Sequence, residues 1–272
     1  MKITQRYFIE LAYDGTNYHG WQIQPNAVTV QQLLNKALST ILRQQVETTG
    51  CGRTDTGVHA KEFFAHFDIQ AMDYGPLTMD CRGINALLPH DIAVKRIFAV
   101  DNDAHARFDA TLRSYEYHIH FQKDPFKHTY SWLLRNRPDT GLMNEAAAII
   151  KEYTDFSCFS KSNTQVKTNN CKISRAEWLE TNDSMVFHIS ADRFLRNMVR
   201  AIVGTLIQVG RREIPPEAVR DIINSKNRSN AGTSVPACGL YLTEVKYEIL
   251  NFGNPISNFE NANEKHTKSA NN

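Results

Sequence analysis

The stretch "ISRAEWLETNDSMVFHISA", residues 173–191, decides the fold class of this chain. Residues 173–180 and 185–191 both have the composition of a strand, and Asn182 and Asp183 between them favour a tight turn. We therefore expect a β-hairpin, in which neighbouring strands run antiparallel. Strands and helices alternate elsewhere in the chain, so a hairpin among them favours an α+β fold over a doubly wound parallel sheet.

The segments on either side of this hairpin supply the alternation. Toward the N-terminus, "SYEYHIHF" (114–121) predicts a strand and "GLMNEAAAIIKEY" (141–153) predicts a helix. Toward the C-terminus, the sequence predicts helices over 194–210 and 215–226 and a closing strand over 239–250.

The first hundred residues alternate in the same way. "RYFIELAYDG" (6–15) places apolar side chains at every second position and predicts a strand. A helical stripe over 29–44 begins at Thr29, which fits a capping box with Gln32. The remaining elements of this part, a strand, a helix and a strand, are expected at 63–69, 77–88 and 91–100.

These patterns together predict two fused split β-α-β halves, of the ferredoxin- or RRM-like kind. We expect the N-terminal half at residues 1–103 and the C-terminal half at 104–250. From about Asn251 the periodicity stops, and residues 251–272 contain seven Asn in 22 positions. This segment is expected to be a flexible tail.

Composition excludes several classes of protein. Of the 272 residues, 42% are apolar and 22% are charged, which is ordinary for a soluble globular protein. The net charge is only +2, so any basic surface must be local. There is no apolar run of signal-peptide or membrane-span length. The five cysteines are odd in number, far apart and without a CxxC motif, which argues against disulfides and zinc and favours a reduced, cytoplasmic setting.

The loop "CGRTDTGVHA" (51–60) contains one acid, Asp55, with Arg53 and His59 nearby. On local pattern alone, an Asx-turn that satisfies the carboxylate with backbone amides is the favoured interpretation. The functional alternative is a nucleophile or general base in a glycine-rich loop. Such a carboxylate needs a cationic partner once water is excluded, and this could be Arg53 or an arginine from another segment.

Two further segments contain cations that could serve the same site. In "ADRFLRNMVRAIVGTL" (191–206), the spacing predicts Arg193, Arg196 and Arg200 on one side of a helix, either as a solvated edge or as a row facing phosphates. Arg200 adjoins the apolar stripe and needs an anion, for which Asp55 is a candidate. In "ARFDATLRSYEYHIH" (106–120), Tyr115 is either packing or a platform for a base. His118 and His120 lack a third metal ligand, so no metal site is expected.

Several segments, taken in order, resemble the tRNA pseudouridine synthase A family. The central one is "GRTDTGVHA". It is accompanied by "YDGTNYHGWQIQPNAVTVQQLLNKAL", "GINALLPHDIAV", "HARFDATLRSYEYHI", "FLRNMVRAIVGTLIQVG" and "GLYL". The segments run from residue 7 to about 247, nearly the whole expected folded chain.

The resemblance implies an enzyme that isomerises uridine to pseudouridine in the anticodon stem-loop of tRNA, at positions 38, 39 and 40. It also implies a homodimer without metal or cofactor, and a continuous mixed, largely antiparallel sheet with a central active-site cleft and helices on the opposite face. Carried over by motif, Asp55 is the catalytic acid and Arg200 pairs with it. Tyr115 stacks on the target base, and Arg53 moves into the space that the flipped nucleotide leaves. We further expect substrate contacts from Arg107, Arg196 and His59.

The sequence departs from the family pattern at a few positions. Phe63 and Phe64 stand where a Gly-Gln pair is common, and we expect them to alter a wall of the cleft. Arg196 stands where a His is common, and Cys238 where a larger polar residue is common. The Lys- and Asn-rich segment 161–172 is expected to face RNA.

Two alternatives from other classes were weighed. A non-catalytic RNA-binding protein on the same scaffold would not need the intact set of Asp55, Arg53, Tyr115 and Arg200. A metal-dependent nucleic-acid hydrolase would need clustered carboxylates or histidines, and its activity should vanish with a chelator.

Overall fold

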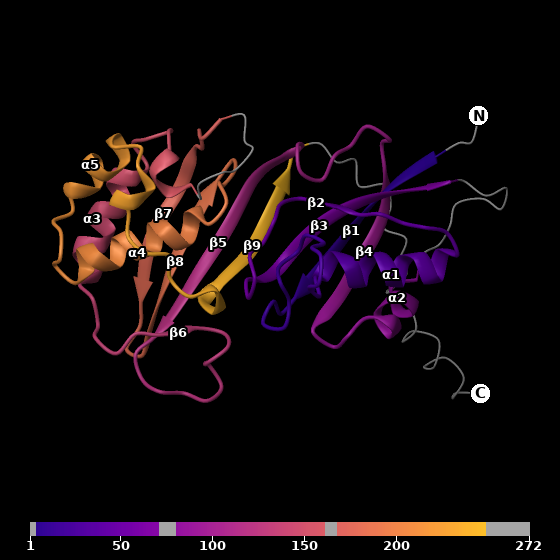
Figure 1. Cartoon of the computed structure of the whole chain (residues 1–272), viewed down its shortest axis with the longest axis horizontal. Helices are drawn as coiled ribbons and strands as arrows, with labels where there is room; N and C mark the ends of the chain where they lie inside the picture. The colour runs from indigo at the N-terminus through magenta and orange to yellow at the C-terminus, as the bar shows by residue number, and fades with distance from the viewer. Residues whose placement is uncertain (1–3, 71–79, 161–167, 249–272) are drawn as a thin grey trace, which may run out of the picture.

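The computed structural model describes residues 4–70, 80–160 and 168–248. These residues form a nine-stranded sheet and five α-helices (Figure 1). The strands are β1 (Thr4–Tyr13), β2 (Thr49–Gly50), β3 (His59–Gln70), β4 (Ile92–Val100), β5 (Ala110–His120), β6 (Trp132–Leu133), β7 (Ile173–Glu180), β8 (Ser184–Ala191) and β9 (Leu240–Tyr247). The helices are α1 (Val30–Leu42), α2 (Cys81–Leu87), α3 (Thr140–Ile150), α4 (Met198–Gly210) and α5 (Ala218–Asn224). The tail expected over 251–272 lies outside the described residues.

The two parts of the chain repeat one strand order. In the first part the order is β4-β1-β3-β2, and in the second part it is β9-β5-β8-β7. In both of these orders the neighbouring strands are antiparallel, and helices connect strands that are not neighbours, while the short β6 pairs parallel with β5 outside the order. This is the split β-α-β arrangement, so the predicted α+β class is confirmed.

One short parallel pairing joins the two parts into a single sheet. His59 and Ala60 at the start of β3 pair with Tyr241 and Leu242 of β9. This contact places the last strand of the chain in the middle of the sheet, between β3 and β5 (Figure 1). The sheet is therefore mixed but largely antiparallel, as expected.

The hairpin that decided the class is present. β7 and β8 pair antiparallel from Glu180 and Met185 onward, and the Thr181 amide donates to the Ser184 carbonyl at 2.8 Å. Helix α1 begins where the capping pattern predicted, because the Thr29 hydroxyl accepts the Gln32 amide at 3.4 Å.

The predicted helix over 194–210 is wrong in its first turn. Asn197 has a left-handed backbone with φ of 66°, and α4 begins only at Met198. Arg193 and Arg196 therefore lie in the preceding loop, and they do not share a helix side with Arg200. Helical spacing alone did not show this interruption.

The helices cover one face of the sheet (Figure 1). In β5, Tyr117 and Ile119 are fully buried against α3 and α4, whereas Glu116 and His118 alternate onto the helix-free face. Phe63 and Phe64 are both buried in the N-terminal core, so neither forms the wall of a cleft. Among the described residues, no helix is both long and apolar enough to cross a membrane.

Candidate active site

The loop between β2 and β3 is held in place by the segment that follows β1. The Trp21 amide donates to the Thr54 carbonyl at 3.3 Å, and the Thr54 hydroxyl lies 3.0 Å from the Tyr13 hydroxyl. Gly20, with φ of 82°, lets this approach occur, since a Cβ there would lie 2.2 Å from the Thr54 carbonyl oxygen. These contacts fix Thr54, the residue directly before Asp55.

The carboxylate of Asp55 does not cap its own loop. The Val58 amide donates to the Asp55 carbonyl at 3.1 Å and forms the turn, and in the described part of the chain no amide donates to the side-chain oxygens. The Asx-turn interpretation is therefore wrong. The side chain is 24% exposed, which leaves it accessible to a substrate.

Two arginines from the other half of the chain face this carboxylate. Arg196 Nε lies 3.5 Å from Oδ1, and Arg200 Nη1 lies 3.7 Å from Oδ2. Arg200 is only 21% exposed and is anchored because its Nε donates to the Val235 carbonyl at 2.7 Å. Asp55 lies beside α4, so the site is on the side of the sheet that carries this helix rather than on the helix-free face.

Arg53, Arg107 and Arg193, which we call the cationic surface, lie close to one another beside Asp55. Partial burial lowers the pKa of Arg107, and the neighbouring charges of Arg53, Arg113 and Arg193 lower it further. Within the described residues, no acidic side chain pairs with any of these three guanidinium groups. Unpaired cations in one place are a suitable surface for phosphates.

Tyr115 lies between the two hydrophobic cores, on the same side as the arginines. Its ring meets Phe194 edge-on, with ring centres 5.1 Å apart and an interplanar angle of 88°. Burial raises the pKa of its phenol, the nearby Cys51 and Asp55 raise it further, and Arg113 opposes them. The phenol is therefore neutral at physiological pH.

Arg113 is a residue of the site that sequence reasoning did not identify. It is buried, and its guanidinium donates only to backbone carbonyls: those of Cys51 at 2.9 Å, Arg107 at 2.6 Å, Ala110 at 3.0 Å and Asp192 at 2.8 Å. It thus ties the Asp55 loop to the segments before β5 and α4. Its position on the apolar face of β5, two residues before Tyr115, was the signal that could have identified it.

His59 does not belong with the site residues. It is 2% exposed, the Gly15 amide donates to its Nδ1 at 3.1 Å, and its Nε2 lies near the carbonyls of Thr129 and Cys238. Burial lowers the pKa of His59, and the carboxylate of Asp14, 2.9 Å from Nδ1, opposes this shift. The structure assigns it to holding the sheet junction instead of the substrate.

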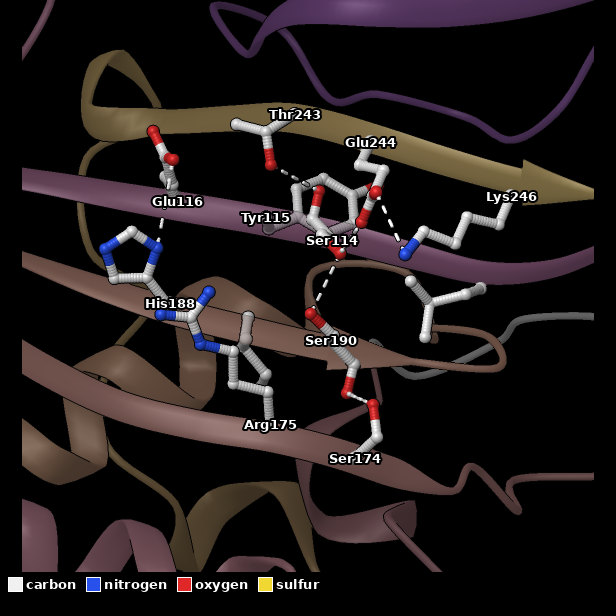
Figure 2. A pocket seen from close by; sticks show the side chains of 12 residues that line it. Ser114, Tyr115, Glu116, Ser174, Arg175, His188, Ser190, Thr243, Glu244 and Lys246 are labelled. Carbon is white, nitrogen blue, oxygen red and sulfur yellow. Dashed lines mark hydrogen bonds and ion pairs between the residues drawn. The ribbon is translucent and has the colours of Figure 1, made fainter.

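A hollow of about 350 Å³ lies in the C-terminal half, lined by side chains of β5, β7, β8 and β9 (Figure 2). The Ser114 hydroxyl lies 2.8 Å from that of Ser190 and donates to Glu244 at 3.1 Å, and Glu244 pairs with Lys246 at 3.1 Å. These four polar side chains of the hollow are thus paired with one another. The described residues contain no group of three potential metal ligands, here or elsewhere.

Comparisons with known proteins agree with one another. A family model described as tRNA pseudouridine synthase matches residues 153–248. The chain is 53% identical over 246 residues to "tRNA pseudouridine synthase A" of Bacteroides fragilis, covering 89% of this chain and 96% of that protein. It is 54% identical over 246 residues to the protein of the same name from Bacteroides thetaiotaomicron, covering 89% and 91%. To that of Clostridium acetobutylicum it is 38% identical over 241 residues, covering 88% and 98%.

Proposed function

The chain belongs to the tRNA pseudouridine synthase family and isomerises uridine to pseudouridine in tRNA, and on this premise we propose that Asp55 is its catalytic group. The proposed targets are positions 38, 39 and 40 of the anticodon stem-loop. One observation supports the role of Asp55 most directly. Its carboxylate accepts no amide of its own loop in the described structure, and faces the guanidinium groups of Arg196 and Arg200.

The chemistry requires an anion close to the sugar. The bond between C1′ and N1 of uridine breaks, the base turns, and a bond forms between C1′ and C5, while C5 loses a proton and N1 gains one. An ionised carboxylate serves this reaction either by attacking C1′ or by accepting the 2′ proton. Arg196 and Arg200 place two positive charges beside the Asp55 carboxylate.

The substrate must bring its uridine out of the stem, because the reacting atoms are stacked inside the helix. We propose that Tyr115 stacks on the extruded base and that Arg53 occupies the space the nucleotide leaves. Arg107 and Arg196 would then contact the flanking backbone. Two observations support this assignment. Arg53 and Arg107 are exposed, and no acidic side chain among the described residues pairs with either guanidinium group.

Replacing Asp55 by Asn tests the assignment. Asn is nearly isosteric but cannot act as an anionic nucleophile or base, so Asp55→Asn should form no detectable pseudouridine while binding tRNA within about threefold of wild type. Asp183→Asn, in the turn between β7 and β8, is the matched control and should be fully active. Single-turnover pseudouridine formation on transcribed tRNA measures both, and normal turnover by Asp55→Asn would remove it from the mechanism.

Four broader expectations remain proposals. We propose a homodimer, located in the cytoplasm, that needs no metal or cofactor. Activity should therefore survive a chelator, which separates this function from that of a metal-dependent hydrolase. We also propose functional halves at 1–103 and 104–250, because β4 ends at Val100 and β5 begins at Ala110.

A further inference from the structure

The connection between β4 and β5 presents two exposed side chains beside the candidate active site. Phe108 keeps 74% of its surface accessible, and Arg107 next to it is also exposed. A single exposed ring is common on protein surfaces. Phe108 differs from such a ring in how it is held and in the charges that surround it.

The backbone of this connection is fixed by side chains from the sheet. The buried His66 accepts the Ala106 amide at 3.1 Å, and the Tyr247 hydroxyl donates to the Ala106 carbonyl at 2.7 Å. Arg113 donates to the Arg107 carbonyl. None of these contacts uses the side chain of Arg107 or Phe108, so the loop is rigid where it is anchored and open where it faces solvent.

The ring of Phe108 is supported from below. His105 packs against it with ring centres 4.2 Å apart and an interplanar angle of 34°, and its Nδ1 accepts the amides of Arg107 and Phe108. The guanidinium carbon of Arg107 lies 5.8 Å from the ring centre. One more planar group could extend this stack on the solvent side.

The surroundings of the ring favour an anionic partner. Arg107 of the cationic surface adjoins Phe108, with Arg53 and Arg193 near Arg107, and Arg53 lies two positions before Asp55 in the chain. An aromatic platform among unpaired arginines matches a single-stranded nucleic acid, in which each base offers a flat face and each phosphate a charge.

We propose that Phe108 is a stacking platform for an unpaired base of the substrate RNA, next to the uridine that enters the site. In this proposal the cationic surface, including Arg193, holds the phosphates on either side of that base. The inference rests on the proposed function, and it adds a specific contact that positions the RNA. Phe108 takes no part in the chemical step.

The test compares Phe108→Ala, Phe108→Tyr and Phe108→Leu in the full chain, with a transcribed anticodon stem-loop carrying 2-aminopurine in its loop. Phe108→Ala should weaken binding by roughly 5- to 150-fold, the range expected for loss of one base–aromatic stack. Phe108→Tyr should bind within about twofold of wild type, and Phe108→Leu should resemble Ala. Stacking should quench 2-aminopurine on wild type and on Phe108→Tyr only.

A matched control separates stacking from general surface effects. Phe126, in the loop between β5 and β6, is 86% exposed, and Phe126→Ala should leave binding unchanged. Salt dependence separates the two parts of the proposal. Arg107→Gln and Arg193→Gln should each flatten the slope of log K against log salt by about one, whereas the neutral Phe108 variants should keep it.

The outcomes distinguish this inference from the proposed function. If wild type forms pseudouridine and Phe108→Ala binds the stem-loop as tightly as wild type, the stacking platform is wrong and the function stands. If Phe108→Ala changes the oligomeric state instead of RNA affinity, the ring is a protein contact and the inference also fails. If wild type forms no pseudouridine in any tRNA, the proposed function fails first.

Discussion

Arg200 divides its guanidinium between two partners. Its Nε donates to the Val235 carbonyl at 2.7 Å, while Nη1 faces Asp55 at 3.7 Å. The pair is therefore not a planar two-point contact between an arginine and a carboxylate. The backbone anchor sets the position of the charge, and the carboxylate remains free to move toward a substrate.

Arg200→Lys should lose most of the activity while folding normally. A lysine keeps one charge but cannot donate to the Val235 carbonyl and face Asp55 at the same time. We expect kcat to fall by at least tenfold with little change in KM for tRNA. Arg220→Lys, on the exposed face of α5, is a suitable control, and activity of Arg200→Lys within about twofold of wild type would assign Arg200 to a solvated surface.

Tyr115 permits a test of its ring against its hydroxyl. If the ring is the platform, Tyr115→Phe should retain much of the base binding, and Tyr115→Ala should lose roughly 1–3 kcal/mol of it. Binding and single-turnover rates should be measured together. If Tyr115→Phe is as inactive as Tyr115→Ala, the hydroxyl takes part in proton transfer at C5, and a role limited to stacking is wrong.

At the scale of elements, α4 shows what helical periodicity cannot reveal. Its apolar stripe predicted the helix correctly from Met198 onward, but the left-handed Asn197 detaches Arg196 from it. The resulting loop brings Arg196 to Asp55 from a direction that a helix would not provide. Similarly, the local pattern favoured an Asx-turn at Asp55 because it contains no information on the distant arginines.

The packing of α4 also constrains the site. Gly204 approaches the 232–233 segment so closely that a Cβ would lie 1.9 Å from the Thr233 carbonyl oxygen. The same segment leads to Val235, whose amide donates to the Arg200 carbonyl at 3.3 Å. A larger residue at Gly204 would therefore displace the 232–235 segment and, through Val235, the backbone of Arg200.

Gly204→Ala should lower the free energy of unfolding by about 1–3 kcal/mol, because the backbone must move to admit the methyl group. It should also reduce kcat by displacing Val235. Gly83→Ala in α2 is the control, since its Cβ would meet only Ile41 at 3.5 Å, and it should be neutral or slightly stabilising. Urea unfolding measures both, and equal stability of the two variants would contradict the close approach.

At the scale of the whole molecule, the alternation of strands and helices along the sequence and one hairpin were enough to predict the α+β class and the split β-α-β arrangement. The register of β3 with β9 could not be predicted, because two residue pairs of parallel sheet leave no periodic signal. The cationic surface was equally hidden. Its members come from the β2–β3 loop, the β4–β5 connection and the segment before α4, and only the folded chain brings them together.

Binding of tRNA should depend steeply on salt although the net charge is only +2, because the cations are gathered at one place. Lys172, whose amide donates to Asp192 at 2.7 Å, enters this region next to Arg193, while Lys161 and Lys167 lie outside the described residues. Replacing all three lysines by Gln should weaken the binding of all substrate tRNAs about equally, and it should flatten the dependence of the tRNA binding constant on salt concentration. Sedimentation should show a homodimer, and a fully active monomer or an unchanged slope would contradict this account of tRNA binding.

The position of β9 has a consequence for how the protein is made. A ribosome releases the chain from its N-terminus, so β1, β3 and β4 can pair early, and β5, β7 and β8 can pair next. The strand that joins both groups is the last to emerge, since β9 ends at Tyr247. Until β9 has paired with both groups of strands, the loop that contains Asp55 and the helix α4 that contains Arg200 belong to two separately folded halves. A nascent chain stalled before residue 240 should therefore protect each half from protease but leave the link between them open to cleavage, and catalysis should begin only after β9 has emerged.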